Sequence, residues 1–324
     1  MELSSANTSR ASAAIIGAAV ADAAARPLHW IYRREDMEVL LQQDKHPEFW
    51  PTSQSPFYTL PTGARSCYNH VVIAGLEAYI EAKGEPDLEV YKSVIRRTFG
   101  DGTAWQEALA RRKEAYSPSK RKAWTEPVVG PWLHGAVIHF LEHGKGDNNN
   151  TEMDGFLLCL PHLVYRAGNS DVLQECIAIS SLLTGNSLMV KCQAQILQKV
   201  LLFQRFSKIY IEGLDVEVQP AAMEVFNHLS DDHLEAVSKF GNNCHLPGSF
   251  QGGLHAFLLD SGPDGFQTSI RATISAGGCN CSRANYAGAL LGAQLGVSVI
   301  PKDWIQNVTD IGDIIKLVKK AQNL

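Results

Sequence analysis

The chain has 324 residues, 45% of them hydrophobic, and this length can bury a sizeable core in one large domain or two ordinary ones. A formal net charge of −5 excludes a global basic field of the kind that attracts nucleic acid or an anionic membrane. The seven cysteines are widely spaced and odd in number, so we expect free thiols in a soluble cytoplasmic protein and no compact disulfide framework.

The first predicted element is an apolar helix, AAIIGAAVADAAARPLHW, at residues 13–30. Asp22, Arg26 and Pro27 interrupt the apolar run and no basic segment precedes it, which argues against a secretory signal and favours a buried helix. Burying the Asp22 carboxylate is costly unless it is paired or binds a cation. Because Arg26 follows four residues later, we favour a structural Asp22–Arg26 pair over a metal ligand. The surrounding alanines nevertheless leave room for a ligand to approach.

Helical periodicity continues through most of the chain. Apolar residues recur at spacings of three and four in VVIAGLEAYIEA (71–82), GFLLCLPHLVYRAG (155–168) and MVKCQAQILQKVLLFQRF (189–206). We therefore predict an all-α fold, a compact single-domain helical bundle. Because no segment has the composition of a flexible linker and no fixed-period repeat is evident, one domain is expected to span residues 1–324.

Segments rich in proline, glycine, asparagine and serine separate the predicted helices. We expect long loops at residues 48–63, 116–132, 144–155 and 241–253. The asparagines at 148–150 are interpreted as the tip of an exposed loop.

Histidines in the middle of the chain do not form a recognisable metal-binding motif. His139 and His143 can share a helix face, with His134 five residues earlier, but no H-E-x-x-H pattern is present. We interpret these three as structural or surface residues. A further four histidines show no ligand spacing: His228, His233, His245 and His255.

Two helices carry small residues along one face. They are Gly17, Ala18, Ala21 and Ala25 in the first, and Ala284, Gly288, Gly292 and Gly296 in the last long one. Small residues let helix backbones approach closely, as they also do in membrane helix pairs. The charged and polar residues within these helices instead favour a close crossing inside a soluble bundle.

The stretch GGCNCSR, residues 277–283, opens the last long helix. Its position at a helix N-terminus is expected to lower the pKa of a thiol and to attract anions. Cys279 and Cys281 alone are a weak zinc signal, because a tetrahedral site needs two further ligands. Cys67 and His70 are candidates for those ligands. Space-filling buried thiols are the alternative that base rates favour.

Five segments occur in the order expected of the ADP-ribosylglycohydrolase family: AAIIGAAVADAAARPLHWIY, GARSCYNHVVIAGLEAY, GPWLHG, LPGSFQGGLHAFL and SAGGCNCSRANYAGALLGAQLGVSVIPKDW. The chain resembles this family from about residue 12 to about residue 310, and within it the branch that contains the J-type crystallins of jellyfish lenses. The resemblance implies an all-α single domain. Active members hydrolyse bonds to ADP-ribose with two magnesium ions held by carboxylates and hydroxyls.

The late Asp-x-Asp-[Thr/Ser] motif of active members falls on Cys279, Asn280, Cys281 and Ser282, which Arg283 follows. Both aspartates are therefore replaced by thiols, and only Ser282 keeps a hydroxyl. Magnesium prefers oxygen ligands, so thiols remove both charge and ligand hardness from such a site.

The early aspartate pair of the family falls on Cys67 and Tyr68, or one register later on Tyr68 and Asn69, and is absent in either case. Asp22 alone matches a family acidic residue. A single carboxylate does not hold two adjacent dications against their mutual repulsion. We therefore expect the magnesium site to be lost, leaving a vestigial site with no catalytic residues, metal or cofactor.

The resemblance and the missing carboxylates together imply a structural constituent of the eye lens. We expect a protein in the cytoplasm of lens cells that contacts itself and other lens proteins at high concentration, without nucleic acid or membrane partners. One alternative is an ADP-ribosyl or related glycoside hydrolase that acts through Asp22. Another is a module that binds an ADP-ribose-like ligand weakly, with a phosphate at Ser282 and Arg283.

Overall fold

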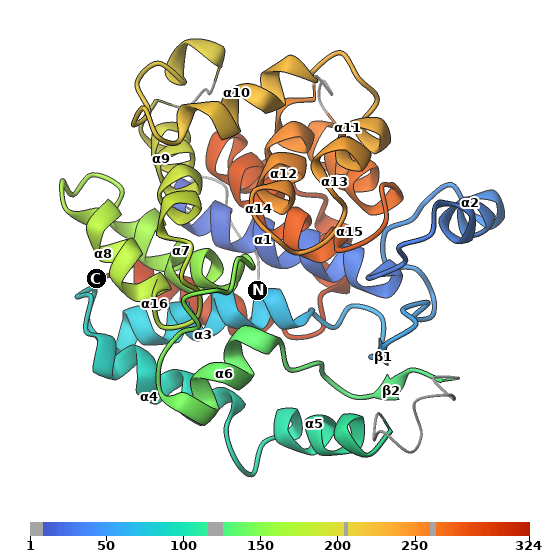
Figure 1. Cartoon of the computed structure of the whole chain (residues 1–324), viewed down its shortest axis with the longest axis horizontal. Coiled ribbons are helices and arrows are strands. Elements are labelled where there is room, and N and C mark those ends of the chain that lie inside the picture. The colour runs from blue at the N-terminus through green and yellow to red at the C-terminus, as the bar shows by residue number, and fades with distance from the viewer. Residues whose placement is uncertain (1–8, 116–125, 204–206, 260–263) are drawn as a thin grey trace.

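The computed structural model describes residues 9–115, 126–203, 207–259 and 264–324, and it confirms the all-α fold (Figure 1). The α-helices are α1 (Arg10–Ala25), α2 (Arg34–Gln43), α3 (Cys67–Glu81), α4 (Leu88–Phe99), α5 (Ala104–Ala115), α6 (Gly135–His143), α7 (Asp154–Arg166), α8 (Val172–Ser180), α9 (Ser187–Phe203), α10 (Gln219–Asn227), α11 (His233–Phe240), α12 (Gly248–Leu258), α13 (Gly265–Ser275), α14 (Asn280–Leu295), α15 (Lys302–Asn307) and α16 (Ile311–Gln322). Short 3-10 turns occur at η2 (Arg26–Leu28), η4 (Lys208–Tyr210) and η6 (Val297–Val299).

Helices α1 and α14 lie side by side at the centre of the molecule (Figure 1). A methyl group on Gly17 would come within 3.0 Å of the Gly288 carbonyl oxygen, and one on Gly292 would come equally close to that of Ala13. Real Cβ atoms essentially never approach this closely, so the predicted close crossing is confirmed. The two small-residue faces are each other's partners.

The predicted burial of the first helix is also confirmed. Every residue of α1 from Ser12 to Ala25 is buried. The segment Arg10–Leu28 is long and apolar enough to span a membrane by length and composition, but 94% of its apolar window is covered by the rest of the protein. Core helices of soluble proteins commonly share these properties.

Two groups of helices cover the central pair. Helices α12 and α13 pack against α14, while α3 and α7 pack together and contact α1. The α3–α7 contact is close at Gly75, where a methyl group would come within 3.0 Å of the Leu158 carbonyl oxygen. Small residues thus set the helix spacing at two places in the core.

The loop predictions hold for three segments where the structure describes them. Residues 48–63 form a loop whose strand β1 (Tyr58–Thr59) pairs in parallel with β2 (Val128–Val129), and Val128 N donates to the Phe57 carbonyl at 3.0 Å. Residues 116–125 lie outside the described part of the chain. The loop predicted at 144–155 is two residues too long, because α7 begins at Asp154, and Asn148 and Asn149 are exposed.

The loop predicted at residues 241–253 is wrong over its second half, where α12 begins at Gly248. Its glycines provide space for packing. A methyl group on Gly252 would lie 2.5 Å from Cδ of Arg283, and one on Gly253 would lie 3.1 Å from the Arg283 carbonyl oxygen. A glycine indicates a turn only where the backbone needs a conformation that other residues avoid. Gly252 and Gly253 are needed for a different reason: a larger side chain at either position would collide with α14.

Candidate functional site

The candidate site lies where the N-termini of α3 and α14 meet the C-terminal half of α1. The thiols at the start of α3 and α14, Cys67 and Cys281, are close enough to Asp22 of α1 for its charge to raise their pKa. Burial raises the pKa of both thiols further, and it is the larger cause. Both groups are therefore neutral thiols at neutral pH.

The glycines before α14 make the predicted turn. Gly277 and Gly278 have φ angles of 66° and 60°, in the left-handed region that glycine adopts without strain. Gly278 N donates to the Ile31 carbonyl at 2.7 Å, and Trp30 N donates to the Gly278 carbonyl at 2.8 Å. These two bonds fix the entrance of α14 against the segment that follows α1.

Asp22 is the acceptor at the centre of a buried polar network. Its Oδ2 accepts from Ser66 N at 2.6 Å, and its Oδ1 accepts from Ser66 Oγ at 2.6 Å and from Asn285 Nδ2 at 2.7 Å. Asn69 Nδ2 donates to Asn285 Oδ1 at 2.7 Å, and Arg65 donates to Asn69 Oδ1 at 2.9 Å. Burial raises the pKa of Asp22, while the bonds from Ser66 oppose that rise.

The predicted Asp22–Arg26 pair is wrong. Arg26 is fully buried, but its Nε donates to the Ala64 carbonyl at 3.1 Å and its Nη2 to the Pro61 carbonyl at 2.7 Å. The guanidinium therefore braces the loop that leads into α3. Sequence spacing could not show this, because the competing acceptors lie more than thirty residues away along the chain.

The thiol of Cys279, the N-cap residue of α14, has polar neighbours. Its Sγ lies 3.2 Å from the Tyr68 hydroxyl and 3.6 Å from His29 Nε2. Burial alone would raise the pKa of Cys279, but hydrogen bonds from Cys244 and His29 hold it well below its usual range. The predicted acidifying effect of the helix N-terminus acts in the same direction at Cys279. For Cys281 the prediction is wrong, because burial raises the pKa of that thiol instead.

The remaining residues of the late motif hold the turn in place. Asn280 Nδ2 donates to the Leu28 carbonyl at 3.0 Å, and Ser282 Oγ donates to the Cys279 carbonyl at 2.9 Å. Arg283 is fully buried and donates to the Gly277 carbonyl as well as to that of Asn242, the latter at 3.3 Å. Ser282 and Arg283, which we considered as phosphate-binding residues, thus donate their hydrogen bonds to backbone carbonyls.

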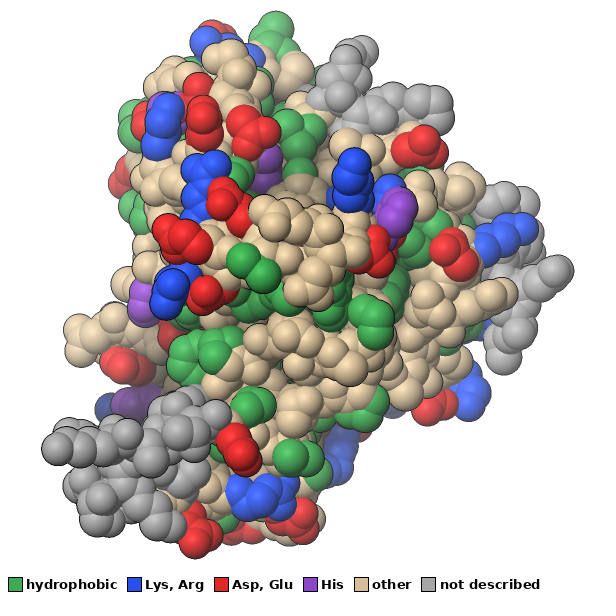
Figure 2. Space-filling model, turned by 90° about the vertical axis from the view of Figure 1, so that its right-hand side faces the viewer, with side chains coloured by type: hydrophobic (Ala, Val, Ile, Leu, Met, Phe, Trp, Pro, Cys, Tyr) green, Lys and Arg blue, Asp and Glu red, His purple; other side chains and the backbone are tan. Residues whose placement is uncertain are grey.

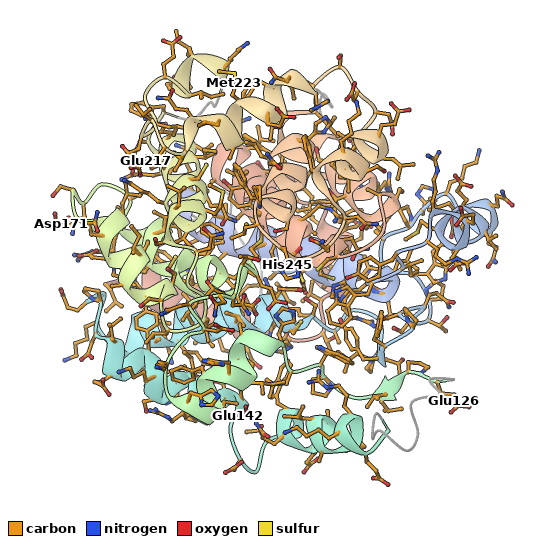
Figure 3. The ribbon with its side chains drawn as sticks, in the orientation of Figure 1. Glu126, Glu142, Asp171, Glu217, Met223 and His245 are labelled. Carbon is orange, nitrogen blue, oxygen red and sulfur yellow. The ribbon has the colours of Figure 1, made fainter. Side chains whose placement is uncertain are left out.

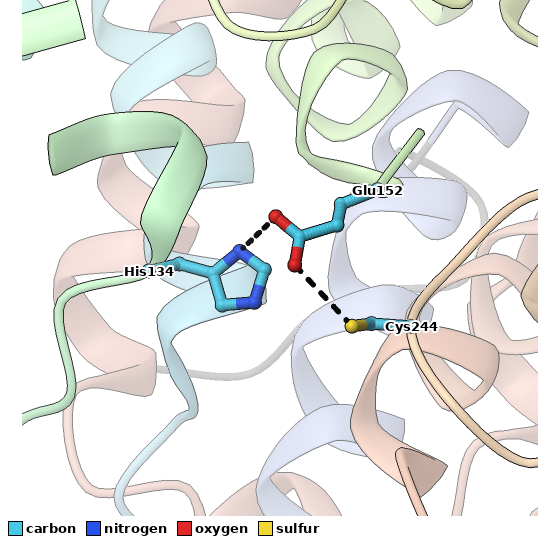
Figure 4. Close-up of side chains that lie close together, drawn as sticks. All are labelled: His134, Glu152 and Cys244. Atoms are coloured by element: carbon cyan, nitrogen blue, oxygen red, sulfur yellow. Dashed lines mark hydrogen bonds and ion pairs between the residues drawn. The ribbon is translucent and has the colours of Figure 1, made fainter. Parts of the chain in front are cut away.

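The proposed zinc set of Cys67, His70, Cys279 and Cys281 does not form a cluster of ligand atoms. The His70 ring packs edge-on against Trp105, with centroids 4.8 Å apart. The described residues contain one group of at least three metal-ligating side chains with atoms within 4.8 Å of one another. That group is His134, Glu152 and Cys244 (Figure 4).

His134 lies at the start of α6 and is almost fully buried. Its Nδ1 is 2.9 Å from Asp154 Oδ2 and 3.2 Å from Glu152 Oε2, and its Nε2 is 3.2 Å from the Tyr68 hydroxyl. Burial lowers the pKa of His134, but the two carboxylates outweigh burial and raise it to about 9. Through Tyr68, this second cluster adjoins Cys279.

Glu152, Asp154 and Cys244 were not predicted as site residues, because nothing in their spacing along the sequence connects them. Glu152 and Cys244 come from loops that an isolated bridge between Glu152 and His245 joins, with Leu246 N donating to the Thr151 carbonyl at 2.7 Å. Figure 3 places His245 near the middle of the molecule in this view. The sequence feature that could have pointed to these residues is the concentration of polar residues in the two loops.

Four of the histidines considered in the sequence form two pairs. The rings of His139 and His143 lie 4.4 Å apart on α6, so the predicted shared helix face is confirmed. His233 and His255, for which spacing gave no role, bring their Nδ1 atoms within 3.0 Å inside the core. His255 Nε2 bonds to the His228 carbonyl at 3.0 Å, which leaves its Nδ1 as the acceptor from His233.

Comparison with known proteins gives consistent matches. A family model described as ADP-ribosylglycohydrolase matches residues 3–324. Crystallin J1A of Tripedalia cystophora is 28% identical over 336 residues, 97% of each chain, and Crystallin J1B of the same animal is 27% identical over 308 residues, 91% of each chain. A solved structure titled "ADP-ribosylglycohydrolase-related protein complex" shares the fold, with a TM-score of 0.59, 17% identity and 97% of each chain covered.

Proposed function

The chain belongs to the ADP-ribosylglycohydrolase family, and from that premise we propose that it is a structural protein of the eye lens, built on this fold without the magnesium site of active members. The observation that carries the proposal is the late motif, where thiols stand at both aspartate positions. The similarity to two proteins named crystallins, over at least 91% of each chain, supports the lens role and a location in the cytoplasm of lens cells.

The surroundings of the late motif support the loss of magnesium binding. Cys281 is a neutral buried thiol whose Sγ lies 3.9 Å from the Asp22 carbonyl oxygen. The Asp22 carboxylate already accepts three hydrogen bonds, from Ser66 and Asn285. A hard dication that demands near-octahedral oxygen coordination is poorly served by these groups.

The state of the thiols suits a protein that must stay soluble at high concentration for a long time. Six of the seven cysteines are buried, and Cys244 is half-buried. Burial raises the pKa of four of them, Cys67, Cys176, Cys192 and Cys281. Buried neutral thiols are slow to oxidise or to exchange disulfides, because the reactive species is the exposed thiolate. Cys279, whose pKa is lowered, is shielded by its burial alone. The partners expected for this role remain copies of the same chain and other lens proteins.

A residual hydrolase is the second candidate, and Glu152 and Asp154 favour it. They are two carboxylates beside a buried histidine, and glycoside hydrolysis commonly uses a carboxylate pair. The measurement that separates the candidates is release of ADP-ribose from ADP-ribosylated arginine and serine peptides, with and without magnesium. We expect no release above the rate without protein, and no change in melting temperature with magnesium or ADP-ribose.

Quantitative proteomics of dissected tissues tests the lens role independently. We expect the protein to be abundant in lens tissue and scarce elsewhere. Trace abundance in the lens would refute the structural role, and turnover of either peptide would assign the chain to the active hydrolases.

A further inference from the structure

We propose that His134, Glu152 and Cys244 form a binding site for a zinc ion, at positions other than those where the late motif of active family members carries its aspartates. The three side chains converge from different elements (Figure 4). His134 begins α6, Glu152 lies in the loop before α7, and Cys244 lies in the loop before α12. One imidazole, one carboxylate and one thiol are a donor set that suits zinc and not magnesium.

The donor atoms lie close enough together to share one ion, because each of the three side chains offers an atom within 4.8 Å of the other two. The two oxygens of Glu152 face the two other ligands: Oε2 lies 3.2 Å from His134 Nδ1, and Oε1 lies 3.5 Å from Cys244 Sγ. Three protein ligands leave the fourth position of the ion open to water, as in zinc sites with an open position.

Unsatisfied buried groups provide an independent reason for a cation. His134 Nδ1 and both oxygens of Asp154 are buried and form no hydrogen bond of acceptable geometry with any described residue, although Nδ1 and Oδ2 are only 2.9 Å apart. His134 and Asp154 thus form a buried ion pair without a well-oriented hydrogen bond, and buried polar groups in that state are costly. A zinc ion would replace the Nδ1 proton of His134 and balance the charge of the two carboxylates that flank the ring.

The backbone holds the ligands in place without a metal. The bridge between Glu152 and His245 fixes the residue next to Cys244, and Cys279 N donates to the Asn242 carbonyl at 2.7 Å. These bonds join the two thiol-bearing segments to the loop that carries Glu152. Ligands held in this way lose little conformational entropy when a metal binds.

The Tyr68 hydroxyl orients the ring of His134 in the proposed zinc site. Tyr68 bonds to His134 Nε2 at 3.2 Å, so the ring is oriented with Nδ1 toward the other ligands, as the outer partners of zinc-bound histidines commonly do. Access is open on one side, because the Glu152 side chain is 15% exposed and Cys244 is half-buried. An ion can therefore reach the site from solvent.

Cobalt(II) titration of the full-length, chelator-treated protein under a non-thiol reductant tests the site. We expect one cobalt ion per chain, with a thiolate charge-transfer band in the near ultraviolet and strong visible bands typical of four-coordinate cobalt. Zinc should displace the cobalt, and excess magnesium should not. Saturation without a thiolate band would overturn the proposal.

Variants locate the ion. Cys244→Ser and Glu152→Gln should each weaken zinc binding by at least about 100-fold, since even the loss of a supporting residue costs up to that much. The matched control is H139Q/H143Q, which removes the surface histidine pair of α6 and should leave binding unchanged. Binding that is lost in this control and retained in Cys244→Ser would place the metal on the surface and end the proposal.

A measurement on the unaltered chain covers the case in which a variant fails to fold. Zinc should slow alkylation of Cys244 by iodoacetamide at least about tenfold, as followed by peptide mass spectrometry. Magnesium at the same concentration should leave the alkylation rate unchanged. An equal rate with and without zinc would contradict the assignment of Cys244 as a ligand.

Discussion

Asp22 joins three of the helices that surround the candidate site. Its carboxylate on α1 accepts from Ser66, which caps α3, and from Asn285 on α14. All of these groups are buried. A buried acceptor with several donors is costly to remove, because each donor is left without a partner and without water. The residue that matches a family acidic position therefore serves here to hold the helix ends together.

Asp22→Ala should lower the free energy of unfolding by about 3 kcal/mol or more, because it leaves three buried donors unpaired. Urea denaturation followed by circular dichroism measures this change. The control is Asp36→Ala, which removes an exposed carboxylate that pairs with Arg33 at the surface. This variant should alter stability by less than about 0.5 kcal/mol. Equal effects in the two variants would show that the network around Asp22 contributes nothing special.

At the scale of the element, the short distance between α1 and α14 depends on glycines at the crossing, which have no side chain. Gly288 lies against α1 so closely that an added methyl group would come 2.7 Å from the Ala21 Cβ and closer still to the Gly17 carbonyl oxygen. Neither neighbour is the end of a flexible side chain that can move aside. The helices would have to separate, and α14 carries Cys279 and Cys281 at its start.

Gly288→Ala should therefore destabilise the protein by about 1–3 kcal/mol, the usual cost of overpacking, despite the better helix propensity of alanine. Gly312→Ala is the matched control in α16, where an added methyl group meets no atom within 4 Å. That variant should be neutral or more stable by up to about 1 kcal/mol. Thermal and urea unfolding show whether each variant is more or less stable than the unaltered chain. An increase in stability in Gly288→Ala would refute the close contact.

For the molecule as a whole, charge is dispersed on the surface, and five histidines are buried among the described residues. On the face drawn in Figure 2, acidic and basic side chains are interspersed outside the grey residues, and no single sign dominates. Such a surface suits a protein that stays soluble at high concentration. In the core, burial, the charge of His255 and that of Arg283 lower the pKa of His233 well below its usual value.

Stability should therefore fall in mild acid. Burial also lowers the pKa of His255, against the opposing bond to the His228 carbonyl. In the unfolded chain these histidines bind protons near pH 6.5, whereas in the folded chain they stay neutral at that pH. Their contribution to the free energy of unfolding is therefore complete above about pH 6.5 and is lost as the pH falls below it. We expect a loss of roughly 1 kcal/mol between about pH 7 and pH 5.5.

Urea unfolding across this pH range measures the effect in two variants. His233→Gln should show a shallower pH dependence than the unaltered chain, because one histidine that resists protonation is gone. His143→Gln, which alters an exposed histidine, should follow the unaltered chain. Parallel curves for all three proteins would contradict the prediction.

Local patterns were enough to predict several features. A spacing of three and four residues reports which helix face is apolar, so the all-α fold and the buried first helix followed from the sequence. The small faces of α1 and α14 predicted a close crossing, and Gly277 and Gly278 predicted a turn, because glycine permits both. The resemblance located the altered aspartate positions.

Only the tertiary structure decided which groups meet. Asp22 bonds to Ser66, 44 residues away, and to Asn285, 263 residues away, so its nearest cation along the helix, Arg26, was a misleading guide. Cys244 and Glu152 are 92 residues apart and converge because a backbone bridge joins their loops. Periodicity fixes the direction of a side chain within its own helix, but contacts between loops and helix ends depend on how all the helices pack.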